Sequence, residues 1–480
     1  MSVERVLPKT LDYTDVLPLA VESKSRRRTF FPNNGNLFNT GGNNIIRIDL
    51  SADALLDTQH SYLRFTAAAA AGAKGIDPAG GHAFISRLRV EQSGTILEDI
   101  QSYNKLMGAI ILPCQASSEY DGVRELTEAQ HAPFSVVNGV SPAPVVTAAA
   151  GQGSTISVGI EHTGLGCNGA AQVPAGTAVD FCIPLTSGLL NCDKLVPLML
   201  MSAPLTIEIE LASTAECVVG AAGDMNIQNV RYIANLVEVG NEVGQQLRML
   251  QEMSGGVLTL AGQTYRHFAG SIPAGGTQTN INVPARVKSM KSIFFNMPGF
   301  NQAGAGALAP SLGSFDVGTG GHNNVESFQF KIGSVVYPPT PIRCRFGTAL
   351  AVAAGNEVTV AGETLMELEK AWGNVGSRFG LGGKTKGAGF YSSAATRATP
   401  LAAGAGFNLA VSTQRYAPFG LDMEAFQRVA IESGVNTADR ALPITLTLDH
   451  TASIASNIDV YVLADALFYI NSDGSMSVSV

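Results

Sequence analysis

One segment of the chain resembles the end of a nucleotide-binding loop. Residues 380–385 read Gly-Leu-Gly-Gly-Lys-Thr, and a P-loop closes with the same Gly-Lys-Thr beside bound phosphates. The complete motif requires a glycine five positions before Gly383, but that position is Arg378. No apolar strand leads into the segment and no helical pattern follows Thr385. The sequence therefore favours a glycine-rich loop over a phosphate-binding site.

The histidines, serines and carboxylates show no catalytic or metal-binding spacing. No H-x-H, H-E-x-x-H or G-x-S-x-G motif occurs. Glu208 and Glu210 share one face of an alternating segment beside Thr206, and we interpret them as solvated or interface-facing side chains. We therefore expect no catalytic residue, no cofactor and no bound metal. The seven dispersed histidines are His60, His82, His131, His162, His267, His322 and His450.

One cluster of positive charge lies near the N-terminus of an otherwise acidic chain. It consists of Lys24, Arg26, Arg27 and Arg28, whereas the whole chain has a net charge of −8 and an isoelectric point of about 5.4. Proteins that bind nucleic acid generally are basic overall, so such a contact would have to be local. The cluster is either a solvated tether, as runs of like charge usually are, or a site for an anionic partner.

The elements that position these residues are predicted to be mainly strands. Apolar and polar residues alternate in many segments, because successive side chains of a strand point to opposite faces. The alternation is seen in residues 45–50, 87–91, 205–211, 328–332, 445–449 and 458–462. Half-buried strands at this density predict antiparallel sheets packed as sandwiches.

Helical periodicity is rare, and long loops separate the strands. Helices are predicted at residues 97–111, 242–253, 365–372 and 421–432. Loops rich in Ala, Gly, Ser and Pro occupy residues 66–82, 138–178, 299–322 and 380–406. Loops longer than about 15 residues are uncommon in compact domains, so these indicate towers or contacts with neighbouring copies.

Length and composition point to a large protein with extensive buried surface. The 480 residues exceed one ordinary domain, and charged residues make up 15%, against about 25% in average proteins. The six cysteines are widely spaced without a C-x-x-C pair, which predicts reduced thiols. The sequence shows no signal-peptide core and no apolar run long enough for a membrane span. We expect a soluble protein that is made and kept in a reducing compartment.

The two halves of the chain resemble each other in the order of their segments. Because alternating strands look alike by chance, the shared order is the evidence for a duplication, and two unrelated sandwiches are the alternative. A sandwich of about eight strands can be a jelly roll. The sequence predicts an extended N-terminal arm at 1–40, a first jelly roll at 41–240 and a second at 241–480. The matched segments are 63–65 with 293–295, 87–92 with 329–334, 204–209 with 443–448, and 226–234 with 457–464.

Three segments of the first half carry a family resemblance. They read FFPNNGNLF, LLDTQHSYLRF and FISRLRVEQSGTILEDIQSYNKL. This succession resembles the double jelly-roll major capsid proteins, in particular those of Polinton-like viruses and the virophage-related lineage of eukaryotic DNA viruses. The positions that carry the resemblance are Leu56, Asp57, Ser61 to Phe65, Arg87 to Val90, Gly94, Leu97, Glu98, Tyr103, Asn104 and Leu106.

The resemblance implies a structural function without enzymatic activity. It implies an all-β fold of two tandem jelly rolls with a few short helices and long loops. Homotrimers would form pseudo-hexagonal blocks that tile an icosahedral capsid, beside neighbouring capsomers, penton proteins and minor capsid proteins. The protein would be made in the host cytoplasm or nucleus and reside in the virion. The cluster of Lys24, Arg26, Arg27 and Arg28 would contact the genome, an inner membrane or a minor capsid protein on the inner surface.

Two other functions stay open on the sequence alone. A tandem β-sandwich can bind carbohydrate or a receptor on a virion or other surface, although only 7% of residues are aromatic and they do not cluster. A jelly-roll enzyme is the other alternative, and the missing metal or nucleophile motif weakens it.

Overall fold

The alternating segments form strands in the computed structural model of the chain. In β11 (Leu205–Leu211), Leu205, Ile207 and Ile209 are buried, whereas Thr206 and Glu210 are partly exposed. The structure describes residues 23–71, 74–76, 80–111, 136–137, 178–220, 224–297, 325–344, 362–372, 410–411, 418–424, 434–438, 443–450, 453 and 455–480. The predicted loops at 138–178, 299–322 and 380–406 lie almost wholly outside these residues.

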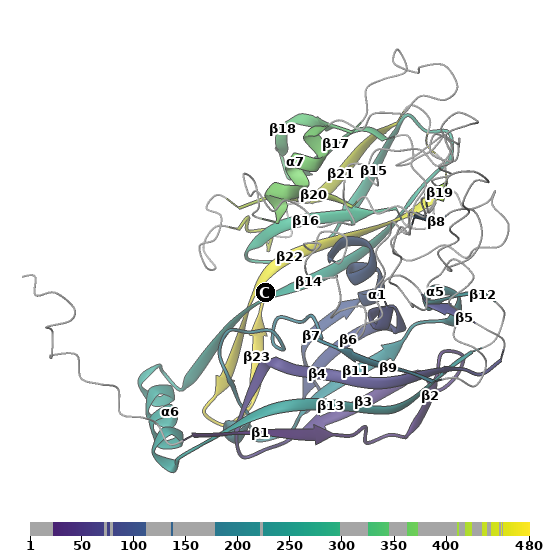
Figure 1. The fold of residues 1–480 in the computed structure, drawn as a ribbon. Helices are drawn as coiled ribbons and strands as arrows, with labels where there is room; N and C mark the ends of the chain where they lie inside the picture. Colours follow the sequence, from purple (N-terminus) through teal and green to yellow (C-terminus); the bar gives the residue numbers. More distant parts are fainter. Residues whose placement is uncertain are drawn as a thin grey trace, which may run out of the picture.

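The first half of the chain forms two facing sheets, drawn in purple and teal in the lower part of Figure 1. The first sheet contains β1 (Ser23–Phe30), β2 (Leu37–Asn39), β4 (Leu55–Ala69), β9 (Ala178–Ile183), β10 (Val196–Pro197) and β13 (Met225–Val239). Its main order is β1-β13-β4-β10, with β2 beside β13 and β9 beside β4. The second sheet has the order β3-β11-β6-β7, with β3 (Ile45–Leu50), β6 (Ile85–Gln92) and β7 (Thr95–Gln101).

The second half repeats this arrangement in the upper part of Figure 1. One sheet contains β14 (Val257–Ile272), β16 (Met290–Asn296), β20 (Phe419–Asp422), β22 (Ser456–Asn471) and β23 (Met476–Ser479). Its order is β14-β22-β16-β20, and β23 pairs with β22. The other sheet has the order β15-β21-β17-β18, with β15 (Gln278–Val283), β17 (Val325–Ile332), β18 (Val335–Arg343) and β21 (Ile444–His450).

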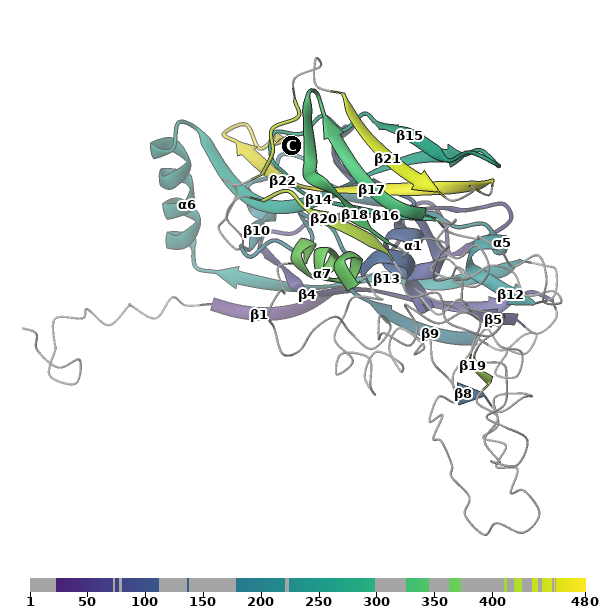
Figure 2. The ribbon, with the colours of Figure 1, turned by 90° about the horizontal axis from the view of Figure 1, so that it is seen from above.

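Short helices and two small strand pairs complete the described structure. The strand pairs are β5 (Lys74–Ile76) with β12 (Val218–Gly220), and β8 (Val136–Val137) with β19 (Ala410–Val411). The helices are η2 (Gly80–Phe84), α1 (Tyr103–Lys105), η3 (Leu106–Ile111), η5 (Leu198–Leu200), α5 (Thr214–Cys217), α6 (Asn241–Met253) and α7 (Gly362–Ala371). Figure 2 shows that α6 projects beyond the sheets at one end of the molecule.

The connectivity of both halves is that of a jelly roll. We number the eight principal strands of each half in chain order, which are β1, β3, β4, β6, β7, β10, β11 and β13 in the first. One sheet then has the order first, eighth, third, sixth, and the other has the order second, seventh, fourth, fifth. The second half gives the same two orders. Two rolls with identical strand order confirm the predicted all-β double jelly-roll fold.

The internal repeat matches strands that occupy equivalent places in the two rolls. Residues 63–65 lie on β4 and 293–295 on β16, which are the third strands of their rolls. In the same way β6 corresponds to β17, β11 to β21, and β13 to β22. The order of alternating segments was therefore sufficient evidence for the repeat, although each single segment is unspecific.

The predicted helix at 97–111 is wrong over its first part. Its first residues, through Gln101, belong to β7, which forms a hairpin with β6. The turn residues Ser93 and Gly94 both have positive φ, at 51° and 83°, which is the geometry of a tight type I′ hairpin. The helical spacing of the apolar residues was coincidental, and helix begins only at Tyr103. The predicted helix at 421–432 likewise starts inside β20, and residues 425–432 lie outside the described part.

The longest strand pair joins the cores of the two rolls. β14 and β22 pair along 16 residues each. Tyr461 and Leu463 of β22 belong to the hydrophobic core of the first roll, whereas Val460 and Val462 belong to the core of the second. This central strand therefore buries both of its faces, one against each roll.

At the contact between the rolls, backbone atoms approach closely at two glycines. A Cβ atom at Gly188 would lie 2.8 Å from the carbonyl oxygen of Gln263, and one at Gly262 would lie well under 3.0 Å from the carbonyl oxygen of Gly188. Real Cβ atoms do not make contacts this short with backbone. The rolls can pack at this distance only because both positions lack side chains.

We expect Gly262→Ala to destabilise the protein by about 1–3 kcal/mol, because the added methyl group overpacks the contact between the rolls. The urea midpoint of unfolding measures this effect. Gly240→Ala is the matched control, since nothing lies within 4 Å of a Cβ atom there. An unchanged midpoint for Gly262→Ala would show that the rolls do not pack as closely as described.

Candidate functional site

The predicted basic cluster lies on an edge strand of the first roll. Lys24, Arg26, Arg27 and Arg28 are all exposed residues of β1, which pairs with β13 alone in its sheet. The interval predicted as an extended arm therefore contributes β1 and β2 to this sheet, and residues 1–22 lie outside the described part. The structure brings the four basic side chains together on one regular strand.

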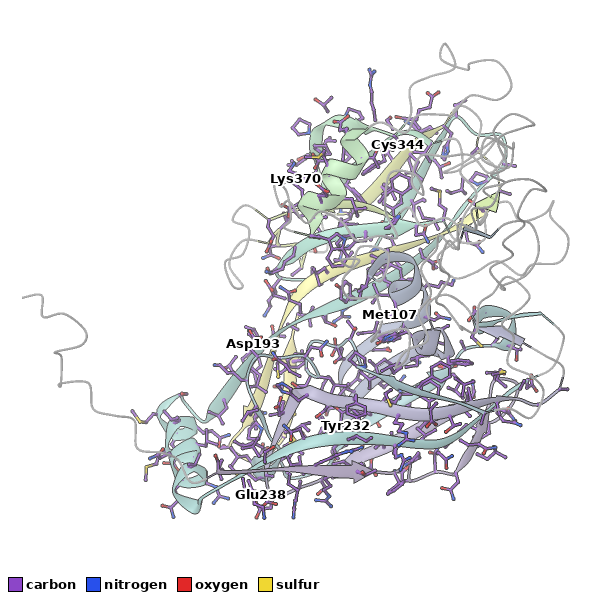
Figure 3. All side chains as sticks on the ribbon, in the orientation of Figure 1. Met107, Asp193, Tyr232, Glu238, Cys344 and Lys370 are labelled. Atoms are coloured by element: carbon purple, nitrogen blue, oxygen red, sulfur yellow. The ribbon has the colours of Figure 1, made fainter. Side chains whose placement is uncertain are left out.

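The side chains of β1 alternate between its two faces. Lys24, Arg26 and Arg28 share the face of the buried Phe30, and Arg27 points to the opposite face. Arg26 forms an ion pair of 2.6 Å with Glu238 of β13, which Figure 3 labels at this end of the roll. The Arg28 guanidinium lies 4.9 Å from the centre of the Phe30 ring. Among the described residues one carboxylate pairs with these four cations, so β1 carries a net positive charge.

A buried carboxylate, Glu98 on β7, lies at the contact between the rolls and is 4% exposed. Its Oε1 accepts a hydrogen bond of 2.6 Å from the Thr264 hydroxyl on β14 and one of 2.9 Å from the Gly188 N–H. The Ser187 hydroxyl donates to its Oε2. Glu98 therefore joins two segments of the first roll to a strand of the second.

Burial raises the pKa of Glu98, and the hydrogen bonds from Ser187, Thr264 and Gly188 oppose the shift. The helical spacing of residues 97–111 predicts a helix at Glu98 and does not indicate this role. No local pattern could have shown it, because the Ser187 and Thr264 hydroxyls lie 89 and 166 positions away.

A second buried polar group crosses the same contact. Asp459 of β22 is 3% exposed, and its Oδ1 lies 2.7 Å from His267 Nε2 on β14. Its other oxygen lies 3.3 Å from Lys105 Nζ of the first roll. The Tyr461 hydroxyl donates a hydrogen bond of 3.0 Å to the Ser102 carbonyl. Polar partners from both rolls therefore fix how β22 sits on the first roll.

Lys291 of β16 forms a third buried charge cluster nearby. Its Nζ lies 2.8 Å from Glu424 and 3.5 Å from Asp465, which also accepts a hydrogen bond of 2.7 Å from Ser289. Burial lowers the pKa of Lys291, but the two carboxylates outweigh it, so the pKa is raised. The cluster is a paired structural group, because each of its charges has an opposite charge beside it.

Glu208 is a structural ion-pair residue, and the interpretation as a solvated side chain is wrong. It is 8% exposed and lies 2.6 Å from Arg47 Nε and 3.1 Å from Arg89 Nη1. β11 lies between β3 and β6, so Glu208 reaches an arginine on each side. It stabilises the sheet and has no arrangement suited to acid–base chemistry with Glu210.

The other residues considered for chemistry do not gather into a site within the described part of the chain. His60, His82, His267 and His450 lie on four different elements. Among the described residues, no three His, Cys, Asp or Glu side chains form a group that could hold a metal ion. The segment 380–385 and the remaining histidines, His131, His162 and His322, lie outside the described residues. In the described chain, no helix has both the length and the apolar character needed to span a membrane.

The described cysteines are free thiols. They are Cys182, Cys192, Cys217 and Cys344, and all but Cys182 are buried. Burial raises the pKa of Cys344 to about 12, so this thiol stays protonated at neutral pH. The prediction of reduced structural thiols therefore holds for these four, whereas Cys114 and Cys167 lie outside the described residues.

Comparison with known proteins finds matches in structure and none in sequence. No protein-family model matches the chain, and no curated protein matches its sequence. PBCV-1 VP54, as fitted into a reconstruction of the virophage Sputnik, matches with a TM-score of 0.56 and 10% identity, over 98% of this chain and 99% of that chain. The Faustovirus major capsid protein matches with a TM-score of 0.54 and 10% identity, over 94% and 91%. A chain of the Sputnik virophage matches with a TM-score of 0.53 and 10% identity, over 100% and 93%.

These matches extend over nearly the whole of each chain. They include the residues of both rolls. The chain therefore has the double jelly-roll fold of viral major capsid proteins, and the resemblance found in the sequence is confirmed at the level of the fold.

We expect Glu98→Gln to make stability less dependent on pH. Because the folded-state pKa of Glu98 is raised, the unfolded chain ionises first as the pH increases, and the wild-type free energy of unfolding falls between the ordinary value of 4.5 and the raised pKa. A glutamine does not titrate, so the free energy of unfolding of the variant should not fall in this pH range for this reason. Urea midpoints of the wild type and the variant, measured between about pH 4 and pH 8, test this difference.

Glu252→Gln on the exposed surface of α6 is the control for this measurement. Its midpoint should follow the wild-type pH profile. If Glu98→Gln also ran parallel to the wild type, the carboxylate would not titrate differently in the folded state.

Proposed function

We propose that this chain is a structural major capsid protein whose homotrimers tile an icosahedral virion shell. The observation that carries the proposal is the pair of rolls with identical strand order, matched over nearly the full chain to capsid proteins. Two rolls per chain give six rolls per trimer, so a trimer can present nearly hexagonal edges to its neighbours. A double roll is thus suited to a closed lattice.

The surface of the first roll supports self-association. Three large apolar side chains are exposed within a short stretch: Phe31 at 65%, Leu37 at 53% and Ile45 at 41%. Asn34 donates a hydrogen bond of 2.8 Å to the Ile45 carbonyl, and Asn43 donates one of 3.0 Å to the Leu37 carbonyl, so the stretch is held in a defined shape. Ordered apolar side chains of this kind are typical of surfaces that become buried between subunits.

The division of the chain follows from the same proposal. Residues 41–240 and 241–480 would form the two rolls, and residues 1–40 an arm whose strands β1 and β2 complete the first sheet. The partners would be neighbouring capsomers, penton proteins and minor capsid proteins. The protein would act without enzymatic activity or cofactor, in the virion, after synthesis in the host cytoplasm or nucleus.

We expect the purified protein to have a mass in solution of about three times 50.0 kDa, because trimers are the proposed building block. Light scattering after size exclusion measures the mass, and negative-stain images should show hexagonal outlines. A strict monomer without such outlines would contradict the capsid proposal. It would instead favour the alternative, a tandem β-sandwich that binds carbohydrate or a receptor at a virion or other surface.

The basic strand β1 supplies a second element of the proposal, an inner-surface contact. Lys24, Arg26, Arg27 and Arg28 would bind the genome, an inner membrane or a minor capsid protein, since among the described residues Glu238 alone forms an ion pair with them. Deleting this segment would also remove a paired strand. Substitution with glutamine is the cleaner test, because it removes charge and leaves the backbone pairing intact.

We expect the fourfold glutamine variant of β1 to bind duplex DNA and anionic vesicles more weakly. The dependence of log K for DNA on log salt should flatten by about one unit for each cation that contacts phosphate. Lys331→Gln with Arg343→Gln on the exposed surface of the second roll is the control. Equal affinities for the wild type and the β1 variant would rule out this contact.

A further inference from the structure

The helix α6 carries an exposed apolar flank. Met249, Leu250 and Met253 are 60%, 52% and 84% exposed, and their spacing places them on one side of the helix. On another side, the Gln251 amide donates a hydrogen bond of 3.0 Å to the Ile470 carbonyl of β22, which anchors the helix to the body. The flank is thus held in a fixed place while its apolar side chains remain more than half exposed.

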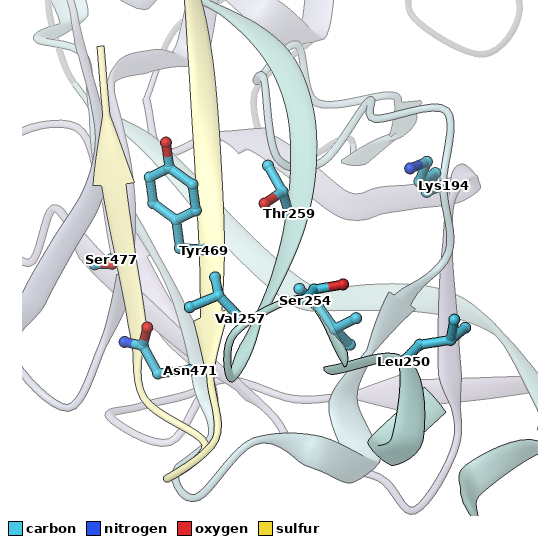
Figure 4. A pocket seen from close by; sticks show the side chains of 9 residues that line it. Lys194, Leu250, Ser254, Val257, Thr259, Tyr469, Asn471 and Ser477 are labelled. Carbon is cyan, nitrogen blue, oxygen red and sulfur yellow. The ribbon is translucent and has the colours of Figure 1, made fainter. Parts of the chain in front are cut away.

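A groove continues from this flank toward the second roll. It has a volume of about 720 Å³ and runs between the end of α6 and the strands β14, β22 and β23. Leu250 belongs both to the flank and to the groove, whose other apolar lining includes Val257, Leu258 and the ring of Tyr469. Figure 4 shows Leu250 and Ser254 at the α6 end and Tyr469 at the strand end. Leu250 joins the apolar flank to the groove, whose lining is mixed because Lys194, Ser254, Thr259, Asn471 and Ser477 also contribute polar groups.

The described chain begins beside the start of α6, the helix that carries the flank. Ser23, the first residue of β1, pairs with Val239, and α6 starts two residues later at Asn241. Figures 1 and 2 both place the start of β1 at the α6 end of the molecule. Glu22 immediately precedes β1 in the sequence, and the six residues before it are apolar, since residues 16–21 read Val-Leu-Pro-Leu-Ala-Val. In the sequence, an apolar segment therefore precedes a strand that begins beside the start of α6, and the last turns of this helix carry the exposed flank.

The lengths of the segment and the helix match. The 13 residues of α6 span about 20 Å at 1.5 Å per residue. Residues 16–22 in extended form reach about 23 Å from Ser23. The segment can therefore follow the helix from its start to Met253 without help from another chain.

We propose that residues 16–21 dock along the flank formed by Met249, Leu250 and Met253 of the same chain and reach the adjoining groove. Docking buries apolar side chains of both the segment and the helix, and this burial of apolar surface favours the docked state. Docking also determines the direction from which the chain enters the basic edge strand β1. This inference is independent of the proposed capsid function.

A photo-crosslinking experiment on the full chain tests the docking. Benzoylphenylalanine replaces Met253, which is 84% exposed and tolerates the change, or Arg248 on the far side of the helix as the control. After illumination and trypsin digestion, position 253 should be linked to the peptide Thr10–Lys24, and position 248 should not. A mixture of heavy-isotope and light protein distinguishes links within a chain from links between chains.

Substitutions in the segment provide the second arm of the test. Leu17→Asp with Leu19→Asp should lower the yield of the crosslink from position 253 at least about tenfold, because both apolar side chains are lost from the contact. Leu11→Asp, outside the docking residues, should leave the yield unchanged. Links between heavy and light chains, equal links from position 248, absence of the link or an unchanged yield with the double substitution would each overturn the proposal.

Discussion

The strand β22, buried on both faces, is the constraint on which the rest of the structure depends. One face packs into the core of the second roll through Val460 and Val462, and the other meets the first roll through Tyr461 and Leu463. Its pairing with β14 over 16 residues extends the shared sheet from one core to the other. The two rolls are therefore fixed in one relative position.

Buried polar groups add direction to this apolar contact. Glu98 accepts hydrogen bonds from groups of both rolls, and Asp459 lies between His267 of the second roll and Lys105 of the first. Burying such groups costs desolvation, which offsets much of what their hydrogen bonds and ion pairs contribute to stability. Their partners are satisfied in only one arrangement of the rolls, so we infer that they specify the orientation. The close approach of Gly188 and Gly262 sets the distance.

The outer surfaces are then free for partners. The edge strand β1 displays basic side chains, and α6 displays apolar ones at the same end of the molecule. Both surfaces depend on the first sheet, because β13 pairs with β1 and leads directly into α6. The fold thereby places a charged edge strand and a helix with an apolar flank at the same end of the molecule (Figure 1), although β1 and α6 are far apart in the sequence.

The sequence alone determined the strands, their repeat and the basic cluster. Alternation and adjacent charges are local properties of the sequence. The shared order of segments can be read along the chain, so all three features can be recognised without coordinates. It misassigned residues 97–101, since the hairpin with β6 outweighed a helical spacing. Only the tertiary structure decided that Glu98 and Glu208 are buried and paired, and that β22 faces two cores. Those facts depend on partners more than 80 positions away, as the 89-residue separation of Glu98 from Ser187 shows, and no local pattern encodes them.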